Sequence, residues 1–263
     1  MNMQSRSVAL LFLLFVATLS NASPILWIDD SAGRIGTVDV ATGVDTLVGN
    51  SGAALTDIAF DPNGNLYGIT FNSLFSINTS TGAATLIGGG FPVQMNALTF
   101  SSAGVLYGAA TGSNGFYTIN TTTGAATLVG NIGSSSAGDL AFHNGVLYLS
   151  SSTGNLVSIN VSTGAGTIIG SLGPAAGAFG LANGDDNVLY AVNGSNVFSV
   201  NTTTGAGTLV VGYAGVLSGA NGTAFFQEAV VVPSVPEPEN YALLLAGLGL
   251  LGFAARRRKQ QAG

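Results

Sequence analysis

Two aspartates at equivalent places in the chain are the first candidates for chemistry. Asp57 lies in TDIAF and Asp139 lies in GDLAF, two similar segments that each begin an apolar run. Two carboxylates at the mouth of a central channel could serve a glycosidase or hold a cation. The plainer interpretation, which we favour, is that each one caps the end of a strand in water.

The other polar residues offer few of the parts that an enzyme needs. His143 is the only histidine, it lies in the turn segment FHNGVLY, and the chain has no cysteine. Together with the lack of lysine before Lys259, this leaves little basis for a Ser-His-Asp triad, a cysteine nucleophile, a zinc site or a Schiff base. We therefore predict no catalytic residue, no metal site and no cofactor.

Three short acidic segments have ordinary structural interpretations. Asp61-Pro-Asn-Gly-Asn65 begins like a calcium loop but lacks the closing glutamate, so a hairpin turn is favoured. The pairs Asp29-Asp30 and Asp185-Asp186 are neighbours in sequence. Neighbours on a strand point to opposite faces, so neither pair is an acid/base couple by spacing alone.

The elements that must position these residues follow from a repeat of about 40 residues. The segments LWI, LYG, LYG, LYL and LYA begin at residues 26, 66, 106, 147 and 189. Each is followed by an apolar run such as LFSIN, a turn with an Asx residue four places before a glycine, a run such as TLIG, and a run such as LAF. Runs of four to six apolar and β-branched residues bounded by Gly, Asn, Ser or Thr are typical of strands.

Four antiparallel strands per repeat predict an all-β fold, a β-propeller with five blades. The chain would begin at the second strand of a blade, and the last run, Thr223 to Phe226, would complete the blade begun by residues 25–49. That closure would remove the open edge between first and last blades. The alternative is an open β-solenoid or a stack of sheets built from the same repeats.

Tyrosines recur after the leucine of four repeats, at Tyr67, Tyr107, Tyr148 and Tyr190. If they are exposed they favour a lectin-like, ligand-binding propeller with pockets between blades; if they are buried they belong to the core.

The two ends of the chain differ from the repeats. Residues 1–22 have a basic start, an apolar stretch and small residues before Ser23, which is typical of a secretory signal peptide. The repeat domain would cover 23–229, a proline-rich linker 230–240, an apolar helix 241–255 and a basic cytoplasmic tail 256–263. The tail contains Arg256, Arg257, Arg258 and Lys259, which the positive-inside rule keeps in the cytoplasm.

Charge is sparse between these ends. Arg34 is the only basic residue there, against nine aspartates and Glu228. Such a domain cannot neutralise phosphates, so nucleic acid is excluded as a partner and anionic membrane surfaces are disfavoured.

Residues 233–259 closely resemble the PEP-CTERM sorting signal of Gram-negative bacteria that make exopolysaccharide, a motif also labelled the C-terminal domain of ice-binding proteins. The resemblance is carried by Pro236, Glu237 and Pro238, followed by a short glycine-containing apolar helix, the basic cluster and the chain end. It implies processing near the Pro-Glu-Pro motif by an exosortase, with these three residues as substrate positions. An ordinary C-terminal membrane anchor is the alternative.

Together these features predict an exported protein that is not an enzyme, located in the cell envelope or an exopolysaccharide biofilm matrix. Its expected partners are signal peptidase, an exosortase-like enzyme and, transiently, the inner membrane. Exopolysaccharide is a further candidate partner. A lectin-like binding protein is the main alternative, and a glycoside-acting enzyme that uses Asp57 and Asp139 is the next.

Overall fold

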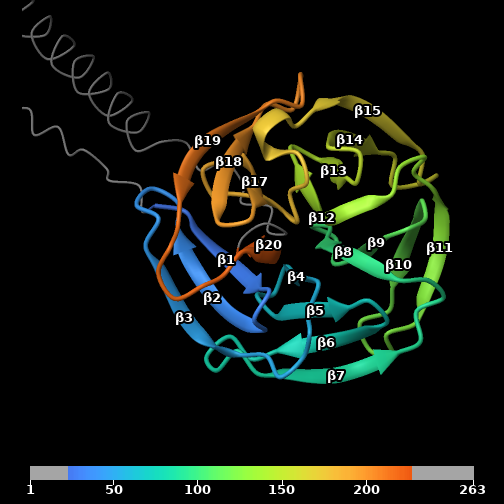
Figure 1. The fold of residues 1–263 in the computed structure, drawn as a ribbon. Coiled ribbons are helices and arrows are strands. Elements are labelled where there is room, and N and C mark those ends of the chain that lie inside the picture. The colour runs from blue at the N-terminus through green and yellow to red at the C-terminus, as the bar shows by residue number, and fades with distance from the viewer. Residues whose placement is uncertain (1–22, 227–263) are drawn as a thin grey trace, which may run out of the picture.

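The computed structural model describes residues 23–226, which form a ring of five four-stranded antiparallel sheets (Figure 1). The predicted five-bladed propeller is therefore confirmed. Within residues 23–226 no helix is long and apolar enough to cross a membrane. The predicted signal peptide, the linker from residue 230, the apolar helix and the basic tail lie outside the described residues.

Four blades are continuous in sequence, and each runs from the axis outward. Blade 1 consists of β4 (Asp57–Phe60), β5 (Leu66–Thr70), β6 (Ser73–Ile77) and β7 (Ala84–Gly89). Blade 2 consists of β8 (Met95–Phe100), β9 (Leu106–Ala110), β10 (Gly115–Ile119) and β11 (Ala126–Asn131). Blade 3 consists of β12 (Ser136–His143), β13 (Val146–Ser151), β14 (Asn155–Ile159) and β15 (Gly166–Ser171). Blade 4 consists of β16 (Gly180–Asn183), β17 (Leu189–Asn193), β18 (Asn196–Val200) and β19 (Gly207–Gly212), and a short 3₁₀ turn, η1 (Gly173–Ala175), precedes it.

Blade 5 joins the two ends of the described chain. Its outer strands are β1 (Ile25–Asp30), β2 (Arg34–Asp39) and β3 (Asp45–Asn50), and its innermost strand is β20 (Ala220–Phe225). β20 pairs with β1 in antiparallel register, with Leu26 opposite Phe225. The predicted closure is confirmed, and it leaves no open edge between the first and last units.

The core consists of five apolar clusters, one at each junction between neighbouring blades. At four junctions an aromatic side chain of the second strand packs on a phenylalanine at the end of the next blade's innermost strand. These pairs are Trp27–Phe60, Tyr67–Phe100, Tyr107–Phe142 and Tyr190–Phe225, with ring centroids 5.2–6.0 Å apart. Most of the recurring aromatic residues therefore stabilise contacts between blades.

The recurring Asx turn also joins blades. In the Asn120 turn of blade 2, Asn120 Oδ1 accepts the N–H groups of Thr122 at 2.9 Å and Thr123 at 3.0 Å, and Gly124 has a φ of 72°. Gly88 of blade 1 lies against this turn so closely that a Cβ atom there would collide with the carbonyl oxygen of Thr123. The turn needs Gly124 for its positive φ, and the contact needs Gly88 for its lack of a side chain.

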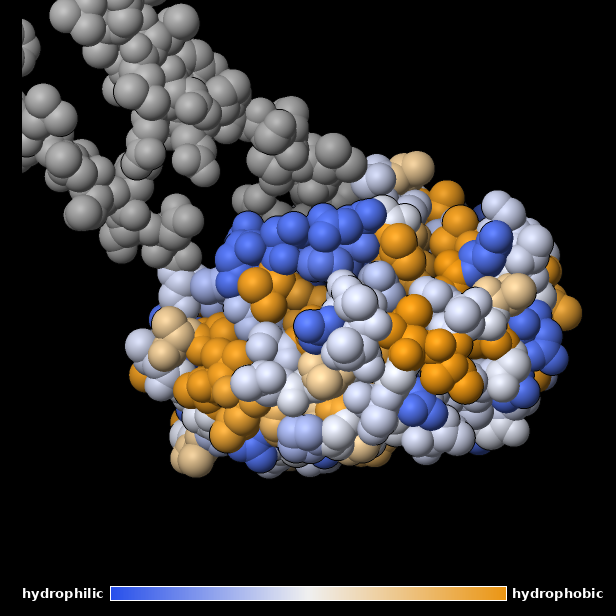
Figure 2. Space-filling view, turned by 90° about the horizontal axis from the view of Figure 1, so that it is seen from above, coloured by the Kyte–Doolittle hydropathy of each residue, from blue (hydrophilic) through white to orange (hydrophobic). Residues whose placement is uncertain are grey.

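The outermost strands form the rim of the ring. Each has a β-bulge against its neighbour. Each also carries an exposed aliphatic residue at the same position, namely Leu47, Leu86, Leu128, Ile168 and Leu209, and β19 exposes Val210 as well. Apolar residues accordingly reach the surface as patches between polar ones (Figure 2). The bulges twist these edges and so oppose pairing with another sheet.

Candidate functional site

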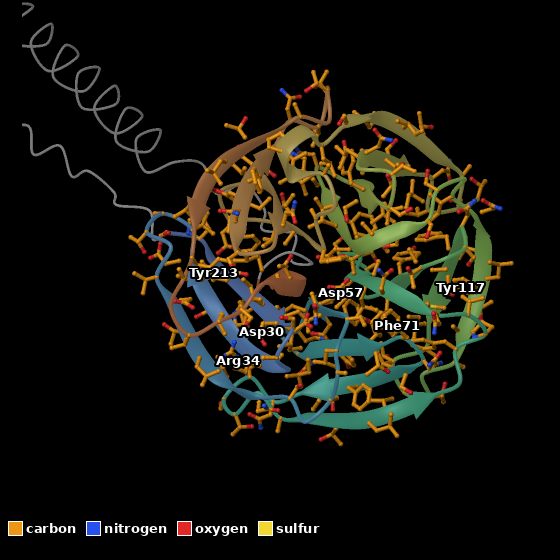
Figure 3. All side chains as sticks on the ribbon, in the orientation of Figure 1. Asp30, Arg34, Asp57, Phe71, Tyr117 and Tyr213 are labelled. Carbon is orange, nitrogen blue, oxygen red and sulfur yellow. The ribbon has the colours of Figure 1, made fainter. Side chains whose placement is uncertain are left out.

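The innermost strands meet at the axis through one equivalent position in each blade. Strand register places Asp57, Ala97, Asp139, Gly180 and Gly222 at this position. The two aspartates are fully buried, and Figure 3 shows Asp57 near the middle of the ring. Since the other three residues have little or no side chain, the axis has room for both carboxyl groups.

Each of these carboxyl groups accepts backbone N–H groups that face the axis. Asp57 accepts from its neighbour Ile58 at 2.7 Å and from Leu98 of blade 2 at 2.5 Å. Asp139 accepts from Leu140 at 2.6 Å and from Leu181 of blade 4 at 2.6 Å. An innermost strand has no further strand to pair with on its axial side, so these carboxyl oxygens satisfy donors that would otherwise be buried without a partner.

The two carboxyl groups are also hydrogen-bonded to each other. Burial, followed by the charge of Asp139 and the hydrogen bond to it, raises the pKa of Asp57 well above its usual range. Burial likewise raises the pKa of Asp139, although the hydrogen bonds from Asp57, Leu181, Leu140 and Thr223 oppose that rise. Two charged carboxylates cannot share such a site, so the two carboxyl groups hold one proton between them.

A third buried carboxylate, Asp29 of β1, lies beside this pair. It is 1% exposed, and neither of its oxygens has a hydrogen-bond partner of good geometry among the described residues. Burial and then the charge of Asp30 raise its pKa well above the usual range, and the nearby N–H groups of Asp29 and Gly222 offset this only in part. A Cβ atom on Gly222 would collide with the carboxylates of both Asp29 and Asp57, so the glycine makes room for them.

Asp30 is held differently from its neighbour. Burial acts to raise the pKa of Asp30, but the hydrogen bond from Arg34 and the N–H groups of Ser218, Arg34 and Ala32 together lower it. The Arg34–Asp30 ion pair is 2.7 Å long, and Arg34 also donates to the Ser218 hydroxyl at 2.7 Å. Asp29 and Asp30 therefore lie in different environments, the first buried beside the axial pair and the second in an ion pair.

The expectation that Asp57 and Asp139 cap strands in water is wrong, because both are buried at the axis. The direct hydrogen bond between them leaves no gap for a sugar or an attacking water, unlike the separated carboxyl pairs of glycosidases. No group of three or more His, Cys, Asp or Glu side chains within residues 23–226 is arranged to hold a metal ion.

His143 replaces an aromatic contact at the junction of blades 3 and 4. There the phenylalanine position of the innermost strand is Asn183, and His143 Nδ1 donates to Asn183 Oδ1 at 2.7 Å. His143 Nε2 accepts from Asn144 Nδ2 at 3.0 Å. Both ring nitrogens are therefore used within the fold. The sequence gives no sign of this role beyond the change from Phe to Asn.

The turns that contain the other aspartates behave as ordinary turns. Asp61 Oδ1 accepts the N–H groups of Asn63 at 2.9 Å and Asn65 at 2.8 Å, so this segment is the predicted hairpin turn. Asp185 and Asp186 lie in the exposed turn before β17, where Asp186 accepts the Tyr190 hydroxyl at 2.7 Å. Burial and then this hydrogen bond raise the pKa of Tyr190.

The four recurring tyrosines differ in exposure. Tyr148 and Tyr190 are 8% and 5% exposed, whereas Tyr67 and Tyr107 are half-buried. Tyr107 lies flat against Phe116, with ring planes 6° apart. In blade 1 the position of Phe116 is occupied by Leu74, and the Tyr67 hydroxyl has no hydrogen-bond partner among residues 23–226. Burial and the Asp61 carboxylate raise the pKa of Tyr67, which keeps its hydroxyl protonated.

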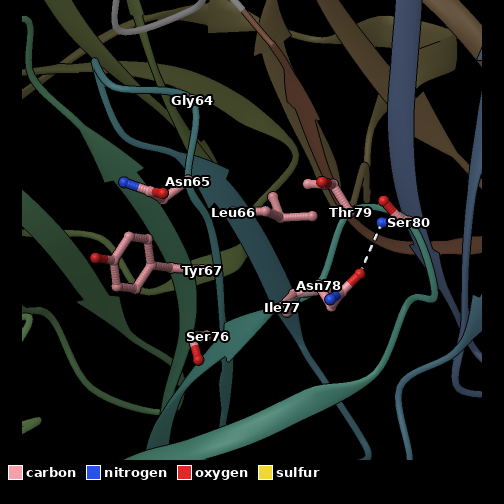
Figure 4. A pocket seen from close by; sticks show the side chains of 9 residues that line it. All are labelled: Gly64, Asn65, Leu66, Tyr67, Ser76, Ile77, Asn78, Thr79 and Ser80. Carbon is pink, nitrogen blue, oxygen red and sulfur yellow. Dashed lines mark hydrogen bonds between the residues drawn. The ribbon is translucent and has the colours of Figure 1, made fainter.

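Tyr67 lines two open grooves, one on each side of the turn from Asp61 to Asn65. The first, of about 440 Å³, lies within blade 1 and is closed on its far side by the turn of Asn78, Thr79 and Ser80 (Figure 4). The second, of about 370 Å³, lies between blades 1 and 2 and is lined by residues that include Asn63, Ser102 and Thr121. The sequence pattern identified Tyr67 together with three other tyrosines and did not distinguish it from them.

Family models match two parts of the chain. Residues 90–226 match a repeat of unknown function, DUF6923, and residues 234–259 match the PEP-CTERM protein-sorting motif. The resemblance of the C-terminal segment to this sorting signal is therefore confirmed. Its residues Pro236, Glu237, Pro238 and the basic cluster lie outside the described residues. No curated protein matches the chain.

Solved structures are similar to this chain at low sequence identity. A chain of a nidogen/laminin complex is 11% identical with a TM-score of 0.52, over 77% of this chain and 98% of that one. A structure from work on the de novo evolutionary emergence of a symmetrical protein is 20% identical to this chain, with a TM-score of 0.49. The similarity covers 73% of this chain and 94% of that one. Virginiamycin B lyase from Staphylococcus aureus is 15% identical with a TM-score of 0.45, over 72% of this chain and 69% of the lyase chain. At 11% identity the similarity to the chain of the nidogen/laminin complex concerns the fold alone.

Proposed function

Because the chain belongs to the DUF6923 repeat family and ends in a PEP-CTERM sorting motif, we propose that it is an exported, non-enzymatic protein of the cell envelope or biofilm matrix. The sorting motif at residues 234–259 is the observation that carries the proposal. The motif indicates export, and the closed propeller before it is the domain that is delivered.

In this proposal the C-terminal segment is a membrane anchor that is present only until the chain is processed. Signal peptidase removes residues 1–22, and the apolar run 241–255 then holds the chain in the inner membrane. Fifteen helical residues extend about 22 Å, which is short for a hydrocarbon core of about 30 Å. The basic cluster stays in the cytoplasm, and an exosortase-like enzyme recognises Pro236, Glu237 and Pro238 on the outer side.

The axial carboxyl groups support a role without catalysis. The two residues whose pairing could have served a hydrolase are buried, hydrogen-bonded to each other and used to cap neighbouring strands. Since a substrate must reach a catalytic group, this arrangement favours a structural role for both residues.

Cell fractionation tests the proposal. The mass and location of the protein are compared in the parent strain, in a strain without the exosortase-like enzyme, and for a Glu237→Ala variant in the parent strain. We expect a form that lacks residues 241–263 outside the cell in the parent, and a membrane-bound form that keeps them in the other two. Retention of residues 241–263 in all three strains would refute the sorting role.

A binding function is the second candidate, and the grooves beside Tyr67 favour it. They combine a half-buried aromatic ring with side-chain hydroxyl and amide groups on an otherwise closed ring. Concave sites with one aromatic wall and a few polar groups are typical of ligand binding.

A further inference from the structure

Several polar side chains in the two grooves beside Tyr67 have no hydrogen-bond partner among residues 23–226. In the groove within blade 1, the side-chain hydroxyls of Ser76, Thr79 and Ser80 make no hydrogen bond to another described residue. In the groove between blades 1 and 2, the same holds for the side chains of Asn63, Ser102 and Thr121. The two grooves together therefore present several free donors and acceptors around one ring.

Charge restricts what these groups can bind. Asp61 is the only charged side chain that lines either groove, and its oxygens are occupied by Asn63, Asn65 and the Asn65 amide. Arg34, the one cation among residues 23–226, forms an ion pair in blade 5. A chain of net negative charge with no cation in the grooves repels polyanions, so a neutral ligand is favoured.

We propose that the two grooves beside Tyr67 bind a neutral polysaccharide, with the ring of Tyr67 as the shared platform between two sugar-binding positions. The ring offers a flat, half-buried face at low entropic cost, and the hydroxyl and amide groups match the hydroxyls of sugars. The inference rests on the proposed location outside the cell and extends it by naming the class of ligand. A peptide fits less well, because the grooves are lined by turns and side chains and not by a free strand edge.

Affinity electrophoresis of the protein in the form that cells produce tests the proposal. The protein is purified from the cell fraction in which it is found. It is then run in native gels that contain dextran, laminarin, hydroxyethyl cellulose or galactomannan. Alginate is the polyanionic comparison, and gelatin is the peptide comparison. We expect retardation by at least one neutral polysaccharide and by neither comparison polymer.

Two blocking variants locate the site. Ser80→Trp fills the groove within blade 1 and Ser102→Trp fills the groove between the blades, and both positions are exposed. Each should weaken binding about tenfold or more. Ser162→Trp, at the place of Ser80 in the equivalent turn of blade 3, and Ser152→Trp, in an exposed turn on the opposite face, are the matched controls and should bind normally.

The outcomes are distinct from those of the sorting experiment. Loss of binding in the two blocking variants but not in the two controls supports the proposal, and so does near-normal binding by Tyr67→Phe, which keeps the ring. Absence of retardation by all four neutral polymers, stronger retardation by alginate or gelatin, or equal binding by blocked and control variants would overturn it. None of these results bears on processing at Pro236 to Pro238, which fractionation measures separately.

Discussion

The shared proton of Asp57 and Asp139 should make the protein less stable as pH rises. In the unfolded chain both carboxyls ionise near pH 4, whereas burial raises the pKa of both in the folded ring. The folded state therefore holds a proton that the unfolded state releases. Each retained proton lowers the free energy of unfolding by about 1.4 kcal/mol per pH unit, so the loss between pH 5 and 7 is about 3 kcal/mol while the pair keeps that proton.

Asp57→Asn isolates this effect. The amide still donates to Asp139, but it carries no titratable proton, so the pH slope should fall by about 1.4 kcal/mol per pH unit. One of the N–H groups of Ile58 and Leu98 loses its acceptor, which should cost about 1–3 kcal/mol at pH 5. The variant should therefore have a lower free energy of unfolding than the parent at pH 5, and the difference between the two should shrink as pH rises.

Urea unfolding followed by circular dichroism at pH 5, 6, 7 and 8 measures these slopes. Asp39→Asn is the matched control, because Asn occupies this turn position in the other four blades and the pKa of Asp39 is lowered, first by the Ser23 hydroxyl. Its slope should equal that of the parent. A parent whose stability is flat or rises from pH 5 to 8, or an Asp57→Asn slope equal to the parent's, would refute the reasoning.

Three further predictions concern the ring itself. Arg34→Met should lower stability by about 1–3 kcal/mol above pH 5, because it leaves the buried Asp30 carboxylate without its cation. Because the ion pair lowers the pKa of Asp30, the difference from the parent should shrink as pH falls below the usual range of an aspartate and Asp30 takes up a proton; urea titrations at pH 6 and at several acidic pH values check this. Gly88→Ala should cost about 1–3 kcal/mol in thermal unfolding, because the added methyl collides with Thr123, and an unchanged melting temperature would contradict the proposed blade contact. A chain that ends before β20 should aggregate or unfold in size-exclusion chromatography, whereas a chain that ends after Phe226 should stay folded and monomeric, since only the second can close the ring.

The strand pattern was predictable from sequence because it is local and repeated. Apolar runs of four to six residues, broken by Asx and Gly turns, recur five times, and each copy supports the others. The closure by the segment around Thr223 followed from counting strands in the first and last units. The position of the β-bulge in each outer strand was not predicted, because it depends on packing against the next blade.

The candidate site was predictable only in part. Asp57 and Asp139 were found because they precede equivalent apolar runs, although Asp57 is the first residue of β4 and Asp139 lies inside β12. Their environment was predicted wrongly. Whether a carboxylate at the axis is solvated depends on what the other blades place there, which here is Ala97, Gly180 and Gly222. Burial at the axis is a property of the closed ring and not of any one repeat.

The sequence alone determined the number of blades, their strand order, the scarcity of catalytic side chains and the sorting motif at the C-terminus, because each of these is written in consecutive residues. The tertiary structure decided which equivalent residues differ in role. Tyr67 borders open grooves while Tyr148 is buried, and Asp29 joins the axial carboxyl groups although its counterpart in blade 1 is Ile69. These differences arise from contacts between residues far apart in the chain, and such contacts exist only once the ring has closed.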